Sequence, residues 1–241
     1  MTTVATSLLP AARQLMRHLP LLLACAATAV APPANSPAAA GWFEAHAKAA
    51  TAVVQTKFPP PSPSAGKFLL MEADLCPADP SINPKPGGCM AQPAVTKLED
   101  MGWIHLVYSP ANDTSPNIEV SLDTATGKMT FKTHDDPFLG DIMHALPVGV
   151  AGATTMQEAL DGVNTLATNF TGKFNTVNFR FPLTPCVTEH IFYFTDSFSV
   201  STGAIGFVAV GAESGKVCKT PITAPDPIIP MCKARLPDCW N

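Results

Sequence analysis

The chain has 241 residues, 46% of them hydrophobic and only 14% charged, and its formal net charge is −4. This composition excludes a mostly disordered chain, because so many apolar side chains can bury enough surface to form a sizeable core. The mild acidic excess, without any block of Lys and Arg residues, argues against a nucleic acid partner.

The N-terminal residues have the pattern of a signal peptide. Arg13 and Arg17 supply a positive region, and residues 19–31 follow as an apolar run that ends in small residues. The run is shorter than the roughly 20 residues that span a bilayer, so no transmembrane segment is expected. We predict a removable leader over residues 1–31 and a secreted, extracellular protein. A lysosomal or vacuolar lumen and a mitochondrial transit peptide are the alternatives.

One helix and four strands are expected in the first half of the remaining chain. Residues 32–66 form a Pro/Ala-rich lead-in with one helix at residues 42–57, which a run of prolines ends. The segment IEVSL alternates apolar and polar residues, so Ile118, Val120 and Leu122 should face inward. The four strands are predicted over residues 67–73, 103–108, 118–122 and 129–132.

The second half repeats this order of a helix followed by strands. A helix is expected at residues 155–167, because apolar residues recur there at helical spacing. Thr154 or Thr155 can cap it, and Glu158 would complete a capping box with Thr155. The strands are predicted over residues 177–181, 190–195 and 205–210.

Two turn sequences in these halves resemble each other. They are LDTATGKM at residues 122–129 and VGAESGKV at residues 210–217, and each should close a hairpin. Neither has the full glycine and hydroxyl pattern of a phosphate-binding loop, so we reject that interpretation. The likeness indicates either an internal repeat or convergent hairpin chemistry.

Cysteine usage agrees with export. Cys25 would leave with the leader, and the even number of cysteines that remains is typical of three disulfides in a secreted protein, although their pairing is left open. The proline-rich tail, residues 220–237, should be an extended wrap fastened by the last two cysteines. Sequons at Asn112 and Asn169 are expected glycosylation sites. The expected disulfide cysteines are Cys76, Cys89, Cys186, Cys218, Cys232 and Cys239.

The sequence contains no recognised catalytic or metal-binding motif. H-E-x-x-H, G-x-S-x-G and the EF-hand loop are all absent. His105 and His190 lie within apolar strands and are interpreted as core or edge histidines. We therefore predict a protein that is not an enzyme and has no cofactor, and the sequence identifies no metal ligand.

Three predicted strands are apolar on both faces, namely WIHLVY, HIFYF and GFVAV. A strand of this kind needs cover on both sides, from helices or from a second sheet. Alternatively, one face of these strands lines an apolar cavity. The sequence leaves both interpretations open.

The last third of the chain resembles the ependymin-related family. An aromatic strand with a Y-T-D-S-like end, F-T-D-S in this chain, follows a single cysteine, and an Asp-Pro segment, a proline-rich cysteine and a terminal Asp-Cys-Trp come after it. The resemblance covers residues 172–241 and, more loosely, residues 118–146. The residues that carry it are Gly172-Lys173-Phe174, Pro185-Cys186, Phe192 to Ser197, Asp226-Pro227, Pro230, Cys232 and Asp238-Cys239-Trp240.

This resemblance implies a β-rich α+β protein over residues 67–241. Two curved antiparallel sheets would form a half-barrel or sandwich around an apolar pocket, with one or two helices packed on it. A secreted glycoprotein of this family would bind a lipid or fatty-acid-like ligand, often dimerise, and be associated with calcium and cell–matrix adhesion. The family cysteine after the middle turn is missing here, where Lys128 and Met129 stand. The expected pocket residues are Ile104, Leu106, Val120, Leu122, Phe179, Phe181, Phe192, Phe194 and Phe207.

A rival interpretation divides the chain in two. A helix followed by strands that end in D-x-x-T-G-K resembles a PepSY-like module, and residues 42–132 and 155–218 would form two of them. That resemblance implies a protease-inhibitory or protein-binding function. One continuous double-sheet core would favour the first resemblance, and two separate helix-on-sheet units would favour the second. A structural extracellular or coat glycoprotein without a small ligand is the third alternative.

Overall fold

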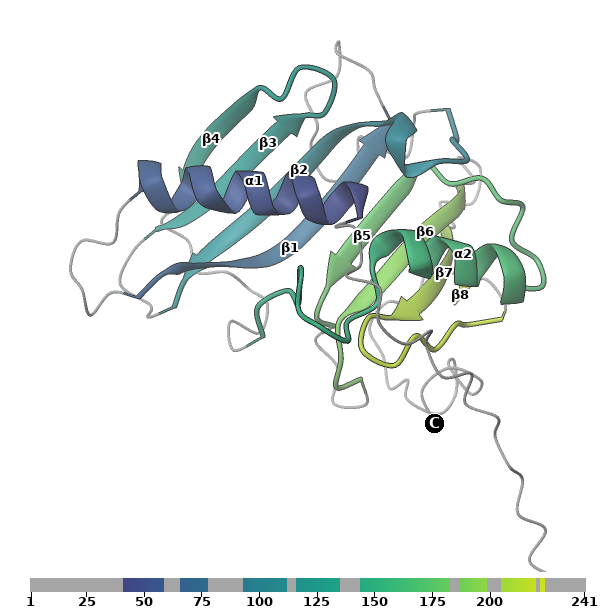
Figure 1. Ribbon diagram of the computed structural model, residues 1–241. Helices are drawn as coiled ribbons and strands as arrows, with labels where there is room; N and C mark the ends of the chain where they lie inside the picture. The colour runs from purple at the N-terminus through teal and green to yellow at the C-terminus, as the bar shows by residue number, and fades with distance from the viewer. Residues whose placement is uncertain are drawn as a thin grey trace, which may run out of the picture. The chain divides into compact units, whose positions relative to one another are not determined.

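The computed structural model describes residues 41–58, 66–77, 93–111, 116–134, 144–182, 187–198, 205–219 and 222–223. These residues all belong to one compact unit, residues 38–241. They form two helices and one antiparallel sheet with the strand order β4-β3-β2-β1-β5-β6-β7-β8 (Figure 1). The elements are α1 (Trp42–Lys57), β1 (Phe68–Pro77), the short 3-10 helix η3 (Leu98–Asp100), β2 (Met101–Pro110), β3 (Asn117–Asp123), β4 (Met129–His134), α2 (Met156–Leu166), β5 (Thr176–Arg180), β6 (Ile191–Phe198), β7 (Ile205–Gly211) and β8 (Ile222–Thr223).

The prediction of a β-rich α+β protein is confirmed, and both predicted helices and all seven predicted strands are present. The described strands form one sheet, however, and not the two that the family resemblance implied. The reason is that β1 pairs with β5, so the strands of the two halves join edge to edge instead of packing face to face. Neither of the two helices is long and apolar enough to cross a membrane, as far as the described residues show.

The sheet consists of two similar halves. In each half a helix precedes an antiparallel meander, namely α1 before β1 to β4 and α2 before β5 to β8. The first strands of the two meanders, β1 and β5, lie side by side at the centre, with Leu75 opposite Val177 and Glu72 opposite Arg180. The topology thus has two helix-on-sheet units, as the rival interpretation requires, but they are fused into one sheet and are not separate.

Both helices pack on the same face of the sheet, which we call the helix-covered face (Figure 1). Alternate strand residues point to this face, and the inward positions predicted for Ile118, Val120 and Leu122 are confirmed, since each is at most 1% exposed. Burial of one such side chain contributes about 1.5–3 kcal/mol to folding. The helices contribute Phe43, Ala47, Ala50 and Val54 from α1, and Met156, Ala159, Leu160 and Val163 from α2.

The helix at residues 42–57 therefore belongs to the packed fold, although it was expected in a lead-in segment. Its Thr51 hydroxyl lies 3.1 Å from the Tyr108 hydroxyl on β2, and its Gln55 side chain donates a 2.6 Å hydrogen bond to the Phe68 carbonyl. These polar contacts fix the position of α1 along β1 and β2.

A buried carboxylate connects the two helices. Oε1 of Glu44, in the first turn of α1, accepts a 2.9 Å hydrogen bond from the backbone N–H of Met156 at the start of α2. The predicted capping box of α2 is confirmed, because Thr155 and Glu158 bond reciprocally. Glu44 is only 7% exposed, and its Oε2 is buried without a hydrogen-bond partner. Burial raises the pKa of Glu44, and the Met156 N–H only partly opposes that effect.

Stability should consequently depend on the protonation of Glu44. Because its pKa is higher in the folded chain than the usual 4.5, its favourable contribution is complete below that value and is lost as the pH rises through the folded pKa. We expect the free energy of unfolding of the wild type, relative to Glu44→Gln, to fall as the pH rises from 4.5 toward neutral pH. Urea denaturation across this range measures it. The matched control is Glu99→Gln, on an exposed acid of η3. If the free energies of unfolding of the wild type and Glu44→Gln differed by the same amount at every pH, the prediction would be contradicted.

Candidate functional site

Most of the residues predicted to line a ligand pocket lie on the helix-covered face. Each of them is at most 2% exposed and belongs to one cluster with the apolar side chains of α1 and α2. The Phe179 ring, for example, stacks on Phe192 at 4.1 Å and meets Phe43 of α1 edge-on at 6.0 Å. These side chains thus contact other protein side chains. The seven residues are Ile104, Leu106, Val120, Leu122, Phe179, Phe192 and Phe194.

The other two predicted pocket residues lie elsewhere. Phe207 of β7 is half-buried and meets Tyr193 edge-on at 5.4 Å. Phe181, just after β5, stacks on the ring of His144 at 4.0 Å and lies edge-on to His190 at 5.2 Å. The nine predicted residues therefore do not surround a common space in the described part of the chain.

The opposite face of the sheet, which we call the second face, carries a row of polar side chains. Cross-strand pairing places Ser121, His105, Asp74, Asn178 and Tyr193 next to one another on β3, β2, β1, β5 and β6. His105 Nδ1 lies 3.4 Å from the Ser121 hydroxyl, and the Asn178 amide donates a short hydrogen bond to the Asp74 carboxylate. The alternating pattern of each strand could have identified these positions, but not the register that aligns them.

An ion pair lies beside this row. Arg180 Nη1 is 3.1 Å from Oε1 of Glu72, and their side chains are 45% and 19% exposed. Burial raises the pKa of Glu72, and the nearby Asp74 adds to the effect, whereas Arg180 opposes it. Burial likewise raises the pKa of the Tyr193 hydroxyl to about 12, so this hydroxyl keeps its proton at physiological pH.

The row brings together a serine, a histidine and an aspartate, which are the residue types of a hydrolase triad. Such a triad also needs N–H groups aimed at a developing oxyanion. Ser121 lies on β3, an interior strand between β2 and β4, where ladder hydrogen bonds use the backbone N–H groups. The row is consequently better suited to hydrogen bonding with a partner than to nucleophilic catalysis.

Exposure divides the second face into two parts. Five second-face side chains of β2 and β3 are half-buried, whereas Ser109 and Asn117 on the same strands and most second-face side chains of β1, β6 and β7 are buried. The half-buried part includes one tryptophan and one valine, which in an antiparallel sheet normally face the core. We call this part the β2–β3 strip, and it consists of Trp103, His105, Val107, Glu119 and Ser121.

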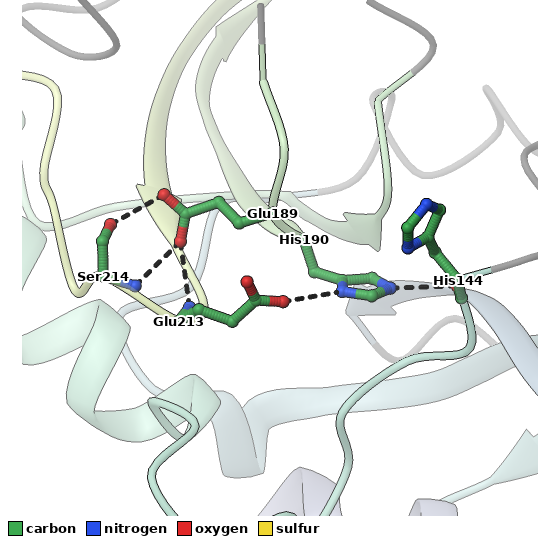
Figure 2. Close-up of polar contacts among 5 residues, drawn as sticks. All are labelled: His144, Glu189, His190, Glu213 and Ser214. Atoms are coloured by element: carbon green, nitrogen blue, oxygen red, sulfur yellow. Dashed lines mark hydrogen bonds and ion pairs between the residues drawn. The ribbon is translucent and has the colours of Figure 1, made fainter.

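A second polar cluster surrounds the turn after β7. The buried Glu189 carboxylate accepts hydrogen bonds from the backbone N–H groups of Glu213 and Ser214, at 3.0 and 2.8 Å, and from the Ser214 hydroxyl at 2.7 Å (Figure 2). Next to it, His190 Nδ1 lies 3.4 Å from Oε1 of Glu213, and Nε2 donates to the His144 carbonyl at 3.0 Å. His190 is therefore a satisfied, buried histidine that holds the segment around His144 against β6.

The turn between β3 and β4 has the same hydrogen-bond pattern, but its carboxylate comes from within the turn. Asp123 accepts from the N–H groups of Ala125 and Thr126, at 2.9 and 3.2 Å. These contacts, with the Thr126 side-chain hydrogen bond as the largest cause, lower the pKa of Asp123. The two backbones match as well, because position 123 bonds to Lys128 as position 211 bonds to Lys216.

Gly211 occupies the position in the second turn that Asp123 occupies in the first. A Cβ atom at Gly211 would lie only 2.5 Å from the carboxylate oxygens of Glu189. The Glu189 carboxylate thus takes the place of the missing aspartate side chain. This correspondence extends the sequence likeness of the two turns to their hydrogen bonds and favours an internal repeat over convergence.

The cysteines and sequons are only partly within the described residues. Cys76 and Cys218 are disulfide-bonded, but no disulfide has both of its cysteines in the described part of the chain, so the pairing is not defined. Asn169 is exposed in the turn after α2, whereas Asn112 lies outside the described residues. So do the predicted leader and most of the proline-rich tail. No group of three or more potential metal ligands occurs among the side chains that the structure describes.

Comparison with known proteins finds no match among family models, curated proteins or solved structures. The resemblances to the ependymin-related family and to PepSY-like modules therefore stay predictions.

The proposed equivalence of the Glu189 and Asp123 carboxylates can be tested by moving the carboxylate of the second turn from position 189 to position 211. Glu189→Ala removes the acceptor of three hydrogen bonds and should lower the free energy of unfolding by about 1–3 kcal/mol. Gly211→Asp should restore most of this loss in the Glu189→Ala background, because its carboxylate can then bond the turn as Asp123 does. In the wild-type background it should destabilise, since it would clash with Glu189.

Urea denaturation of the two single variants and the double variant completes the cycle. Lys216→Gln, at an exposed position of the same turn, serves as the control and should change little. If Gly211→Asp were equally harmful with and without Glu189, the two carboxylates would not be equivalent.

Proposed function

We propose that this chain is an exported protein-binding module, made of two fused helix-on-sheet repeats, whose partner docks on the β2–β3 strip. The observation that carries the proposal is the contrast between the two faces of the same strands. On β2, Ile104 and Leu106 are fully buried under the helices, while Trp103 and Val107 are only half-buried on the second face.

The composition and position of the strip support binding to a protein. Tryptophan is enriched at protein interfaces because it combines a large apolar area with a hydrogen-bond donor. Trp103 lies on β2, which is paired on both sides by β1 and β3, so the strip is presented on a rigid surface. His105 and Ser121 add hydrogen-bonding groups beside it. The PepSY-like resemblance, which implies protein binding or protease inhibition, is consistent with this surface.

A lipid carrier, which the ependymin-related resemblance implies, needs apolar side chains that line a cavity. Seven of the nine residues expected there are packed in the core with the side chains of the helices. The same burial that stabilises the fold therefore accounts for these apolar residues without a ligand. Protein binding on the other face is the function that the geometry supports better.

Export is supported by two features of the described residues. Cys76 and Cys218 are disulfide-bonded, and structural disulfides are typical of oxidising compartments. The sequon at Asn169 is exposed after α2, where a glycan could be attached without disturbing the core. Both features agree with the leader expected from the sequence.

Site-specific photo-cross-linking tests the docking surface. A benzophenone amino acid replaces Val107 on the strip or, as the matched control, Val150, which is 58% exposed outside the strip. Each protein is irradiated in the extracellular fraction of the producing cells. We expect a discrete protein adduct from position 107. Excess wild-type protein should suppress this adduct, and Trp103→Ala should suppress it at least tenfold less effectively. Equal adducts from both positions, or equal competition by Trp103→Ala, would contradict the proposal.

The carrier alternative is measured on the same purified protein. Gentle purification followed by solvent extraction and mass spectrometry should find no lipid near one mole per mole of protein. If the purified protein carries stoichiometric lipid and position 107 gives no specific adduct, ligand transport would replace protein binding as the proposed function.

A further inference from the structure

The carboxylate of Glu44 is buried where the two helices begin, and only one of its oxygens is satisfied. Oε1 accepts the hydrogen bond from the Met156 N–H at 2.9 Å, whereas Oε2 is buried without a hydrogen-bond partner. The residue is only 7% exposed. A buried carboxylate is costly unless its charge is paired, so a cation beside Oε2 would remove a large part of that cost.

The described charges around Glu44 do not supply this cation. Burial, and in addition the negative charge of Glu158 on α2, raise the pKa of Glu44. No Lys, Arg or His among the described residues forms an ion pair with Glu44. The side chains that surround this carboxylate therefore leave its negative charge unpaired.

The backbone of Gly41 lies directly beside the unsatisfied oxygen. A Cβ atom at Gly41 would lie 2.3 Å from Oε2 of Glu44. The Gly41 nitrogen is bonded to the same Cα and is about 2.5 Å from that Cβ position, so it lies within about 5 Å of Oε2. While Gly41 is joined to Ala40, this nitrogen is an amide, and Oε2 accepts no hydrogen bond from it. An α-ammonium at the same position would have three donors that can turn toward Oε2.

The sequence before Gly41 has the features of a cleavage site. Residues 38–40 are three alanines, which place small residues at the last and third-last positions before Gly41. This is the A-x-A-like pattern at which leader peptides are removed. Ala31, the expected end of the leader, is followed directly by Pro32, whereas Ala40 is followed by the small residue that lies beside Glu44.

We propose that the mature chain begins at Gly41 and that its α-ammonium forms an ion pair with the buried carboxylate of Glu44. A signal peptidase hydrolyses the Ala40–Gly41 peptide bond with one water. The oxygen of this water goes to the Ala40 carboxylate, and both of its protons go to the Gly41 nitrogen, which becomes an ammonium. The proposal rests on the export proposed above, but it does not depend on the β2–β3 strip.

The ion pair would connect the new N-terminus with both helices. Gly41 is the N-cap residue of α1 and has no side chain to cap this helix, while Glu44 already bonds the start of α2 through Met156. The N-terminus of each helix carries about half a positive charge, which repels the ammonium. The full charge of a carboxylate at hydrogen-bond distance attracts the ammonium more strongly than these partial charges repel it.

The cut should also reverse the effect of pH on stability. The fall with rising pH that is predicted above for Glu44 applies to the chain in which Gly41 is still joined to Ala40. In the mature chain, the ammonium should favour the ionised carboxylate and lower the pKa of Glu44, so its contribution to stability is lost as the pH falls. Glu158 acts on Glu44 in both forms and does not affect this comparison.

The N-terminus of the exported wild-type protein tests the cut without any variant. The protein is purified from the extracellular fraction of the producing cells, denatured, labelled at its α-amine, digested and analysed by mass spectrometry. We expect a labelled peptide that begins at Gly41. A chain that still begins at Met1 would overturn both this proposal and export, whereas a chain that begins at any other residue would overturn this proposal alone.

The rate of acylation of the Gly41 amine tests the ion pair. Acetyl N-hydroxysuccinimide ester at neutral pH reacts with neutral amines, and the ion pair should hold the Gly41 amine in its unreactive ammonium form. In the folded mature protein, we expect this amine to react at least tenfold more slowly than in urea. Glu44→Gln should speed the reaction of the folded protein severalfold, because the amide carries no charge.

The matched control is Glu99→Gln, on the exposed acid of η3, which should leave the rate of acylation unchanged. Equal rates for folded wild type and folded Glu44→Gln would overturn the ion pair. If Glu44→Gln did not fold, the wild type alone would decide, since equal rates in the folded state and in urea would also overturn it.

Discussion

The pairing of β1 with β5 is the interaction on which the rest of the structure depends. Four residue pairs, from Glu72 with Arg180 to Leu75 with Val177, join two meanders into one sheet. This pairing leaves α1 and α2 on the same face, so their apolar sides share one core. It also brings the start of α2 within reach of Glu44 on α1. Without this seam, each half would have an unpaired strand edge and a much smaller core.

Local structure could be predicted from the sequence, whereas the way in which the halves meet could not. The capping box of Thr155 and Glu158 and the hairpin turn DTATGK are encoded within a few residues, and both form as predicted. The register of β1 against β5 joins residues about a hundred positions apart, and alternating apolar patterns fit many partners. The strand patterns therefore could not test the two sheets and the apolar pocket that the family resemblance implied.

The candidate site shows the same limit of prediction from the sequence, because its residues come together only through strand pairing. The strand patterns put His105 and Ser121 on the side away from the core, but only the pairing of β2 with β3 brings them together. The second turn is more instructive, because Gly211 in the sequence suggests that the carboxylate of the first turn has no equivalent. The structure supplies that carboxylate from Glu189, which lies 22 residues before Gly211 in the sequence. The two halves thus keep the turn but hold it with different residues.

The measurement that tests the central claim most directly is hydrogen exchange of the folded chain, read separately for β1, β5 and the outer strands. If β1 and β5 form the seam of one fold, their amides should exchange only through global unfolding, with the same free energy in both halves. Exchange of residues 42–132 and 155–218 at clearly different free energies, with β1 and β5 no better protected than β4, would show two independent units and contradict the account.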